Sequence, residues 1–284
     1  MRRNASRTAG VGLLVLALGL VAAPSAAQSA ATPTLTGFAS LPALTFVPGS
    51  EPAGAALGDE FGPWLLHFDR GGRLLTAPIP LPGVRAPENA AGNPTLGSSK
   101  GFEGMAHSPD GRYLYPLLEG TVAGDQPGDL RFNEFDGKRG GYTGKHWTYR
   151  LESPSHAIGD AIPVDANRFL MIERDGAQGD AAAVKRIYLA DRRDRDHDGT
   201  MDKTLVVDLL KIANPRGVGG FGEVFRFPFQ TIEDVALLDG RTLAVLNDNN
   251  FPGSAGRTPG VADNNEFITV KLPSSLHPDP RVLP

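Results

Sequence analysis

The chain has 284 residues, of which 40% are apolar, and a formal net charge of −4. That apolar content suffices for the core of one sizeable domain, while modest acidity suits neither nucleic acid nor an anionic membrane as a partner. The absence of cysteine excludes disulfides, zinc–thiolate sites and cysteine nucleophiles, and the 35 glycines and 24 prolines indicate the many tight turns of an all-β protein.

The N-terminus has the pattern of an export signal. Arg2, Arg3 and Arg7 precede an apolar run at residues 11–23, which is too short to span a bilayer comfortably. Small residues at positions 25–27 then form a cleavage site. The sequence therefore predicts a signal peptide over residues 1–27, cleaved near Ala27, and a secreted or periplasmic protein. A buried N-terminal helix is the alternative interpretation.

Residues 28–56 are predicted to be irregular, because prolines and glycines interrupt them repeatedly. The remainder, residues 57–284, carries an internal repeat. An acidic patch, a turn, a short apolar strand and a second acidic patch follow one another three times, in residues 101–120, 158–175 and 231–249. A half copy precedes them at residues 57–62.

The repeat has a nearly constant register. Its first acids are Glu103, Asp160 and Glu233, which lie eight or nine residues before the arginine of the turn. Its second acids, seven residues after that arginine, are Glu119, Asp175 and Asp248. A strand-based period of roughly 50–60 residues is typical of propeller blades with four strands each. Coincidence is the alternative, since acid–apolar strings are common in β-proteins.

The predicted fold is therefore an all-β propeller over residues 57–284, with about four recognisable blades and an incomplete ring. Equivalent points of successive blades converge near the axis of a propeller. We expect Asp59, Glu60, Glu103, Asp160 and Glu233 to line one central channel.

Several longer motifs resemble the phytase-like ("esterase-like activity of phytase") family of exported bacterial β-propeller proteins. They occur in order over residues 57–272, at positions 58–63, 101–106, 115–120, 172–175, 227–234 and 247–252. The resemblance implies a propeller that hydrolyses phosphate or other esters. In one respect the sequence departs from the family: about 100 residues of blade sequence that members carry before position 58 are missing, which would leave the first blade incomplete.

The repeated carboxylates are hard oxygen ligands of the kind that calcium and magnesium prefer. A metal held by them can clamp a phosphate or polarise an ester carbonyl. The candidate metal ligands in the repeats are Asp59, Glu60, Glu103, Asp160, Glu233 and Asp234. Glu103, Asp160 and Glu233 are also the candidate catalytic residues, and Arg174, Lys185 and Arg257 the candidate substrate contacts. The alternative is that the acids cap turns and the basic residues are surface groups.

Residues 194–202 give a separate signal. Asp194, Asp196 and Asp198 alternate with other residues, and Gly199 takes the sixth position, as in the first half of a calcium loop. The twelfth position is Leu205 instead of glutamate, so an EF-hand is not predicted. The sequence predicts a structural calcium site here, with a solvated acidic turn as the alternative.

Residues 97–101 match the nucleophile-elbow pattern with Ser99 at its centre. That motif requires a strand before the serine and a helix after it. Here a proline-rich loop precedes Ser99 and a predicted strand follows, so Ser99 is not predicted to be a nucleophile.

Two classes of function follow from these features. The first is an exported, metal-dependent hydrolase of phosphate or related esters, monomeric, with a small-molecule substrate and with calcium or another divalent metal as cofactor. The second is a non-catalytic extracytoplasmic propeller that binds a metal or ligand and is inactive because blade sequence is missing.

Overall fold

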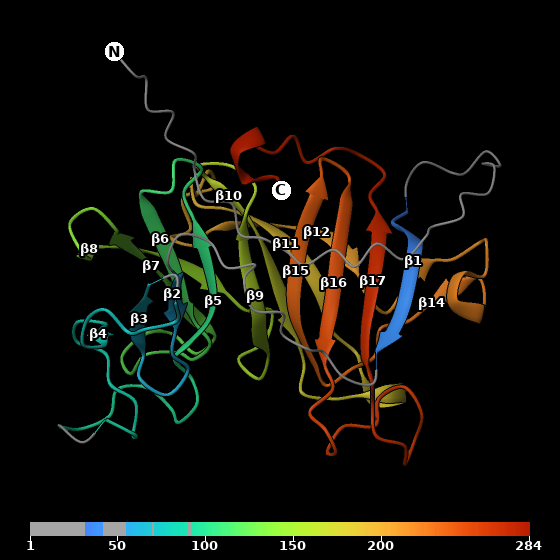
Figure 1. Cartoon of the computed structure of the whole chain (residues 1–284), viewed down its shortest axis with the longest axis horizontal. Coiled ribbons are helices and arrows are strands. Elements are labelled where there is room, and N and C mark those ends of the chain that lie inside the picture. Colours follow the sequence, from blue (N-terminus) through green and yellow to red (C-terminus); the bar gives the residue numbers. More distant parts are fainter. Residues whose placement is uncertain (1–31, 42–54, 70, 90–91) are drawn as a thin grey trace.

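The computed structural model describes residues 32–41, 55–69, 71–89 and 92–284. Four sheets stand side by side as blades, which confirms the predicted all-β propeller with about four blades (Figure 1). Within these described residues the helical elements are three short 3-10 helices: η1 (Gly179–Ala181), η2 (Val218–Gly220) and η3 (Pro280–Val282). No helix in this part of the chain is long and apolar enough to cross a membrane.

The strands follow one another through the blades in chain order. Blade 1 contains β2 (Ala55–Gly58), β3 (Trp64–Phe68) and β4 (Ile79–Pro80). Blade 2 contains β5 (Phe102–His107), β6 (Tyr113–Leu118), β7 (Asp129–Asp136) and β8 (Gly141–Arg150). Blade 3 contains β9 (Ala157–Pro163), β10 (Arg168–Arg174), β11 (Lys185–Asp191) and β12 (Asp202–Asp208).

Blade 4 combines strands from both ends of the chain. Its inner strands are β15 (Thr231–Asp239), β16 (Thr242–Asp248) and β17 (Asn265–Lys271). The outer strands are β1 (Thr34–Leu41), β13 (Ile212–Ala213) and β14 (Val224–Phe225). The innermost strands of three blades are in contact, because β9 touches β5 on one side and β15 on the other. The starts of these strands therefore lie close together.

Strand β1 corrects one prediction. Residues 34–41, which composition predicted to be irregular, pair antiparallel with β17 from Thr34 opposite Lys271 to Leu41 opposite Asn265. The pairing joins segments more than 200 positions apart, so no local pattern indicates it, and it buries Leu35 completely. The predicted signal peptide and residues 42–54 lie outside the described residues.

In the described residues, the first strand of blade 1, β2, corresponds to the second strand of blade 2, β6. Strand β2 ends where β5 begins, since the Phe102 amide donates to the Asp59 carbonyl at 3.0 Å. Strand β6 also ends there, with Leu118 paired to Phe102. In the described part of the chain blade 1 thus has three strands, with β2 in the place of β6, as the half copy of the repeat indicated.

In the part of the chain that the structure describes, the core consists of three layers between neighbouring blades. Tyr115 and Phe132 of blade 2 pack against Phe169 and Met171 of blade 3. The next residues of β10, Leu170 and Ile172, point the other way and pack against blade 4. A third layer joins blades 1 and 2. Successive residues of a strand face opposite sides of the sheet, so a strand that is buried on both faces has a continuous run of apolar residues. Strand β10 shows this run in the sequence Phe-Leu-Met-Ile.

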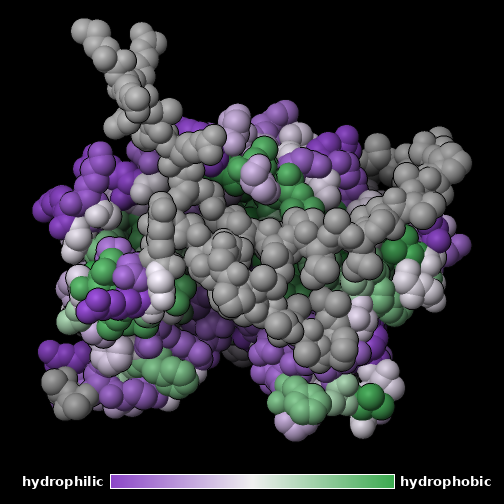
Figure 2. Space-filling model, in the orientation of Figure 1, coloured by the Kyte–Doolittle hydropathy of each residue, from purple (hydrophilic) through white to green (hydrophobic). Residues whose placement is uncertain are grey.

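On the face in Figure 2, the described residues that are visible form hydrophilic areas with groups of apolar residues between them. In this view a notch in the lower edge separates the loops of blade 1 from those of blade 4. Strand β15 runs upward and β16 downward in Figure 1, so the acid-bearing ends of blade 4 lie toward this lower edge.

Candidate functional site

Each of the three touching inner strands contains a β-bulge at its acidic end. Phe102 and Gly104 pair with the consecutive residues Leu118 and Leu117, so Glu103 is the extra residue in β5. Glu233 is the extra residue in β15 for the same reason. In β9 the irregularity falls between Ile158 and Ala161. A bulge redirects the side chain that it carries, and in β5 the bulged residue Glu103 lies with Glu60 and Glu119.

The strand pairing shifts the second copy of the repeat by one residue. Ile158 pairs with Glu173 as Phe102 pairs with Leu118, so the residue level with Glu103 is Gly159 and not Asp160. A sequence comparison aligns the acids, whereas the bulges set the actual register. By the same shift Arg174, and not Asp175, takes the position of Glu119 in its blade.

Gly159 leaves room for a neighbouring side chain. A Cβ atom at this position would lie 1.9 Å from the carbonyl oxygen of Ile232 and 3.3 Å from Oε2 of Glu233. The Glu233 side chain therefore passes over the glycine of β9. It comes within hydrogen-bonding reach of the Glu103 carboxyl.

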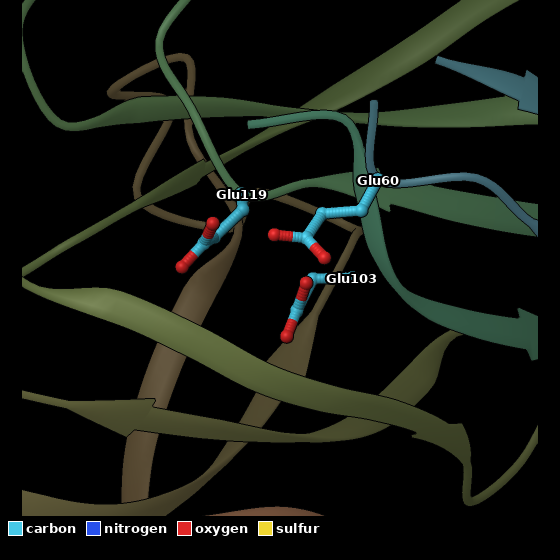
Figure 3. A group of neighbouring side chains, drawn as sticks. All are labelled: Glu60, Glu103 and Glu119. Carbon is cyan, nitrogen blue, oxygen red and sulfur yellow. The ribbon is translucent and has the colours of Figure 1, made fainter. Parts of the chain in front are cut away.

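Glu103 of this pair also lies close to two further carboxylates. Glu60 follows β2, Glu103 lies in β5 and Glu119 follows β6, and one oxygen of each lies within 4.8 Å of the others. Their side chains point toward one another in Figure 3. Glu119 was recognised in the sequence as a second acid of the repeat but not as a site residue. The signal was its position at the end of a strand that pairs with β5.

Two cations and a hydroxyl surround the carboxylates. Nζ of Lys100 lies 3.0 Å from Oε2 of Glu119. The Arg174 guanidinium lies 3.2 Å from Oε1 of Glu233 and 3.9 Å from Oε1 of Glu119. The hydroxyl of Ser99 donates a hydrogen bond to Glu60. Neither Lys100 nor Ser99 was a candidate site residue from the sequence.

The negative charge of the cluster is only partly compensated. Burial, and then the neighbouring carboxylates Glu233, Glu119 and Glu60, raises the pKa of Glu103 from 4.5 to about 8. Burial also raises the pKa of Glu233, against the opposing effect of Arg174. Without a metal the pair thus retains a proton near neutral pH. A hard divalent cation fits this all-oxygen donor set, because it supplies the missing positive charge.

The remaining acids of the predicted channel are placed differently. The Asp160 carboxylate accepts from the Val235 amide at 3.1 Å and from the Ala161 amide at 2.7 Å. It thereby ties β9 to β15, and burial raises its pKa to about 7. Asp59 has a buried Oδ1 without a hydrogen-bond partner, and Asp234 is exposed.

Of the three basic candidates, Arg174 alone is shown in contact with the cluster acids. Lys185 is completely buried, with its ammonium 2.9 Å from Oδ1 of Asp175 and 3.1 Å from the Gln230 carbonyl. Nε of Arg257 donates to Glu266 at 2.8 Å, and its guanidinium lies 4.8 Å from the centre of the Phe221 ring. Both residues hold blade elements together in this structure.

The acidic loop between β11 and β12 forms a second carboxylate group. Asp194, Asp196 and Asp202 each offer an oxygen within 4.8 Å of the others. Asp198 instead accepts from the amide and hydroxyl of Thr200, at 2.8 and 2.7 Å. Asp196 and Asp202 also line a cavity of about 310 Å³ together with Lys203.

The fold and the site thus define a β-propeller with a carboxylate cluster where strands of blades 1 and 2 meet. A family model described as Phytase-like, esterase-like activity of phytase, matches residues 47–251. This span is more than half of the chain, so the chain belongs to the Phytase-like family, which makes it a hydrolase-type propeller at the level of the family. No curated protein matches the sequence significantly.

Proposed function

We propose that the protein is an exported, metal-dependent hydrolase of phosphate or related esters. The observation that carries the proposal is the convergence of Glu60, Glu103 and Glu119 within 4.8 Å, on a propeller of this family. The export signal predicted over residues 1–27 supports a secreted or periplasmic location.

Glu60, Glu103 and Glu119 are the residues that would hold the metal, and calcium suits their hard oxygen atoms. When bound, the metal would supply Lewis-acid chemistry by polarising a phosphoryl or carbonyl oxygen of the substrate. Asp160 is assigned a supporting role, because two backbone amides already occupy its carboxylate.

Side chains of the protein supply a positive charge for the substrate and a group for proton transfer. Arg174 reaches both Glu119 and Glu233, so it can stabilise negative charge that develops on an ester oxygen beside the cluster. Glu233 stands outside the three-carboxylate group and lies within hydrogen-bonding reach of Glu103. It is therefore the candidate general acid–base group.

A specific observation favours a second candidate, a non-catalytic propeller that binds a metal or ligand. Among the described residues, three cations near the site are each paired with an acid: Lys100 with Glu119, Arg174 with Glu233 and Lys185 with Asp175. An anionic substrate has to compete with an acid for each of these cations, whereas a metal ion binds the acids themselves.

Hydrolysis of p-nitrophenyl phosphate and p-nitrophenyl acetate with added calcium distinguishes the two candidates. We expect Glu103→Gln to lose at least about 100-fold in turnover, because metal activation supplies several kcal/mol to the transition state. Without metal, its melting temperature should not fall below that of the wild type, since the buried carboxylate carries a cost that glutamine removes. Glu223→Gln, at an exposed position, serves as the control.

Turnover that survives Glu103→Gln unchanged contradicts the proposed site. Binding of calcium by the wild type without hydrolysis of either ester supports the binding propeller instead.

A further inference from the structure

Ser99 has an unfavourable backbone conformation at the edge of the cluster. Its φ angle is +53°, in the left-handed region that glycine adopts freely and serine does not. Strained residues persist where their surroundings fix them, and they concentrate at functional sites.

The surroundings of Ser99 do fix it. The Gly101 amide donates to the Glu60 carbonyl at 2.7 Å, and the Glu119 amide donates to the Gly101 carbonyl at 2.8 Å. The Gly120 amide donates to the Lys100 carbonyl at 3.1 Å. Lys100 and Gly101, directly after Ser99, are therefore bonded on both sides to the two segments that carry Glu60 and Glu119, which fixes the chain next to Ser99.

The side chains of this short segment contact the carboxylates of those same two segments. The Ser99 hydroxyl donates to Glu60, and the Lys100 ammonium lies 3.0 Å from Glu119. Each contact restricts the rotation of one glutamate. An outer hydrogen bond that fixes the orientation of a metal-ligating carboxylate commonly changes metal affinity about 10- to 100-fold.

We propose that Ser99 is a positioning residue whose hydroxyl holds the Glu60 carboxylate toward Glu103 and Glu119, so that the cluster is organised before a cation arrives. The proposal rests on the metal site of the proposed function. It also explains why a serine occupies a glycine conformation: the hydroxyl orients a ligand at the expense of stability.

Two substitutions separate the hydroxyl from the strain. Ser99→Gly removes both, and Ser99→Ala removes the hydroxyl while its Cβ keeps the strain. The measurements are the melting temperature of the metal-free protein and calcium affinity by titration calorimetry. We expect both variants to bind calcium about 10-fold more weakly or worse. Ser99→Gly should melt at an equal or higher temperature than the wild type, and Ser99→Ala should show no gain.

Ser98→Ala is the matched control. Its hydroxyl bonds the exposed Glu88, one residue away from Ser99 in the same loop. The calcium affinity of this variant should equal that of the wild type.

Three other results contradict the proposal, and each leads to a different conclusion. Wild-type affinity in both Ser99 variants refutes the positioning role, and leaves the proposed hydrolase intact if the wild type still turns over ester. A lower metal-free melting temperature for Ser99→Gly shows that Ser99 supports the fold rather than the site. A wild type that binds no calcium refutes the metal-dependent function and the positioning role together.

Discussion

At the scale of single residues, glycines set how closely the inner strands approach. A Cβ atom at Gly104 would lie 2.7 Å from the Ala161 amide nitrogen, and one at Gly159 would lie 1.9 Å from the Ile232 carbonyl oxygen. These two positions lie where β5 meets β9 and where β9 meets β15. The close approach brings Glu233 of one blade near Glu103 of another across β9, and the charge of Glu233 helps to raise the pKa of Glu103.

Gly159→Ala tests this packing. We expect the free energy of unfolding to fall by about 3 kcal/mol or more, because the methyl group overlaps backbone that cannot move without separating two blades. Urea denaturation followed by circular dichroism measures the change. Gly141→Ala is the control, since a Cβ atom there meets nothing within 4 Å. Equal urea midpoints for the two variants would show that β9 and β15 do not pack this closely.

At the scale of elements, the sequence predicted which strands carry acids but not their register. The repeat located the first acids to within one residue, and they lie at bulges, which a pattern of acids cannot reveal. Glu119 lies in the cluster because β6 ends beside β5. Lys185, a predicted substrate contact, is instead buried with three oxygen atoms around its ammonium. Such contacts depend on distant strands, as does the pairing of β1 with β17.

The acidic loop, residues 194–202, gives a prediction at this scale. If Asp194, Asp196 and Asp202 hold a structural calcium, a chelator should lower the melting temperature of the wild type more than that of Asp196→Ala. Differential scanning calorimetry with and without chelator measures both shifts. Asp180→Ala, which alters a fully exposed carboxylate, should respond as the wild type does. Equal chelator shifts in all three proteins would leave the loop as a plain acidic turn.

At the scale of the whole molecule, the blades bring carboxylates together that are far apart in sequence, and this makes stability depend on pH. The pKa values of Glu103 and Asp160 in the folded protein are about 8 and about 7, against ordinary values of 4.5 and 3.8. Between these limits the folded protein retains protons that the unfolded chain has released. Raising the pH therefore favours unfolding across this window. Carboxyls with lowered pKa values, such as Asp279 at about 2, act in the opposite sense and below about pH 4.

We therefore expect the melting temperature of the metal-free protein to fall steadily from about pH 5.5 to about pH 8.5. Glu103→Gln should flatten this dependence, because it removes the group whose proton is retained longest, while Glu223→Gln should follow the wild type. Added calcium should raise the melting temperature more at the upper end of the range than at the lower end, since a cation can then take the place of the released proton. A metal-free melting temperature that stays constant or rises over this range would show that Glu103 and Glu233 ionise freely, and that no compensating cation is needed between the blades.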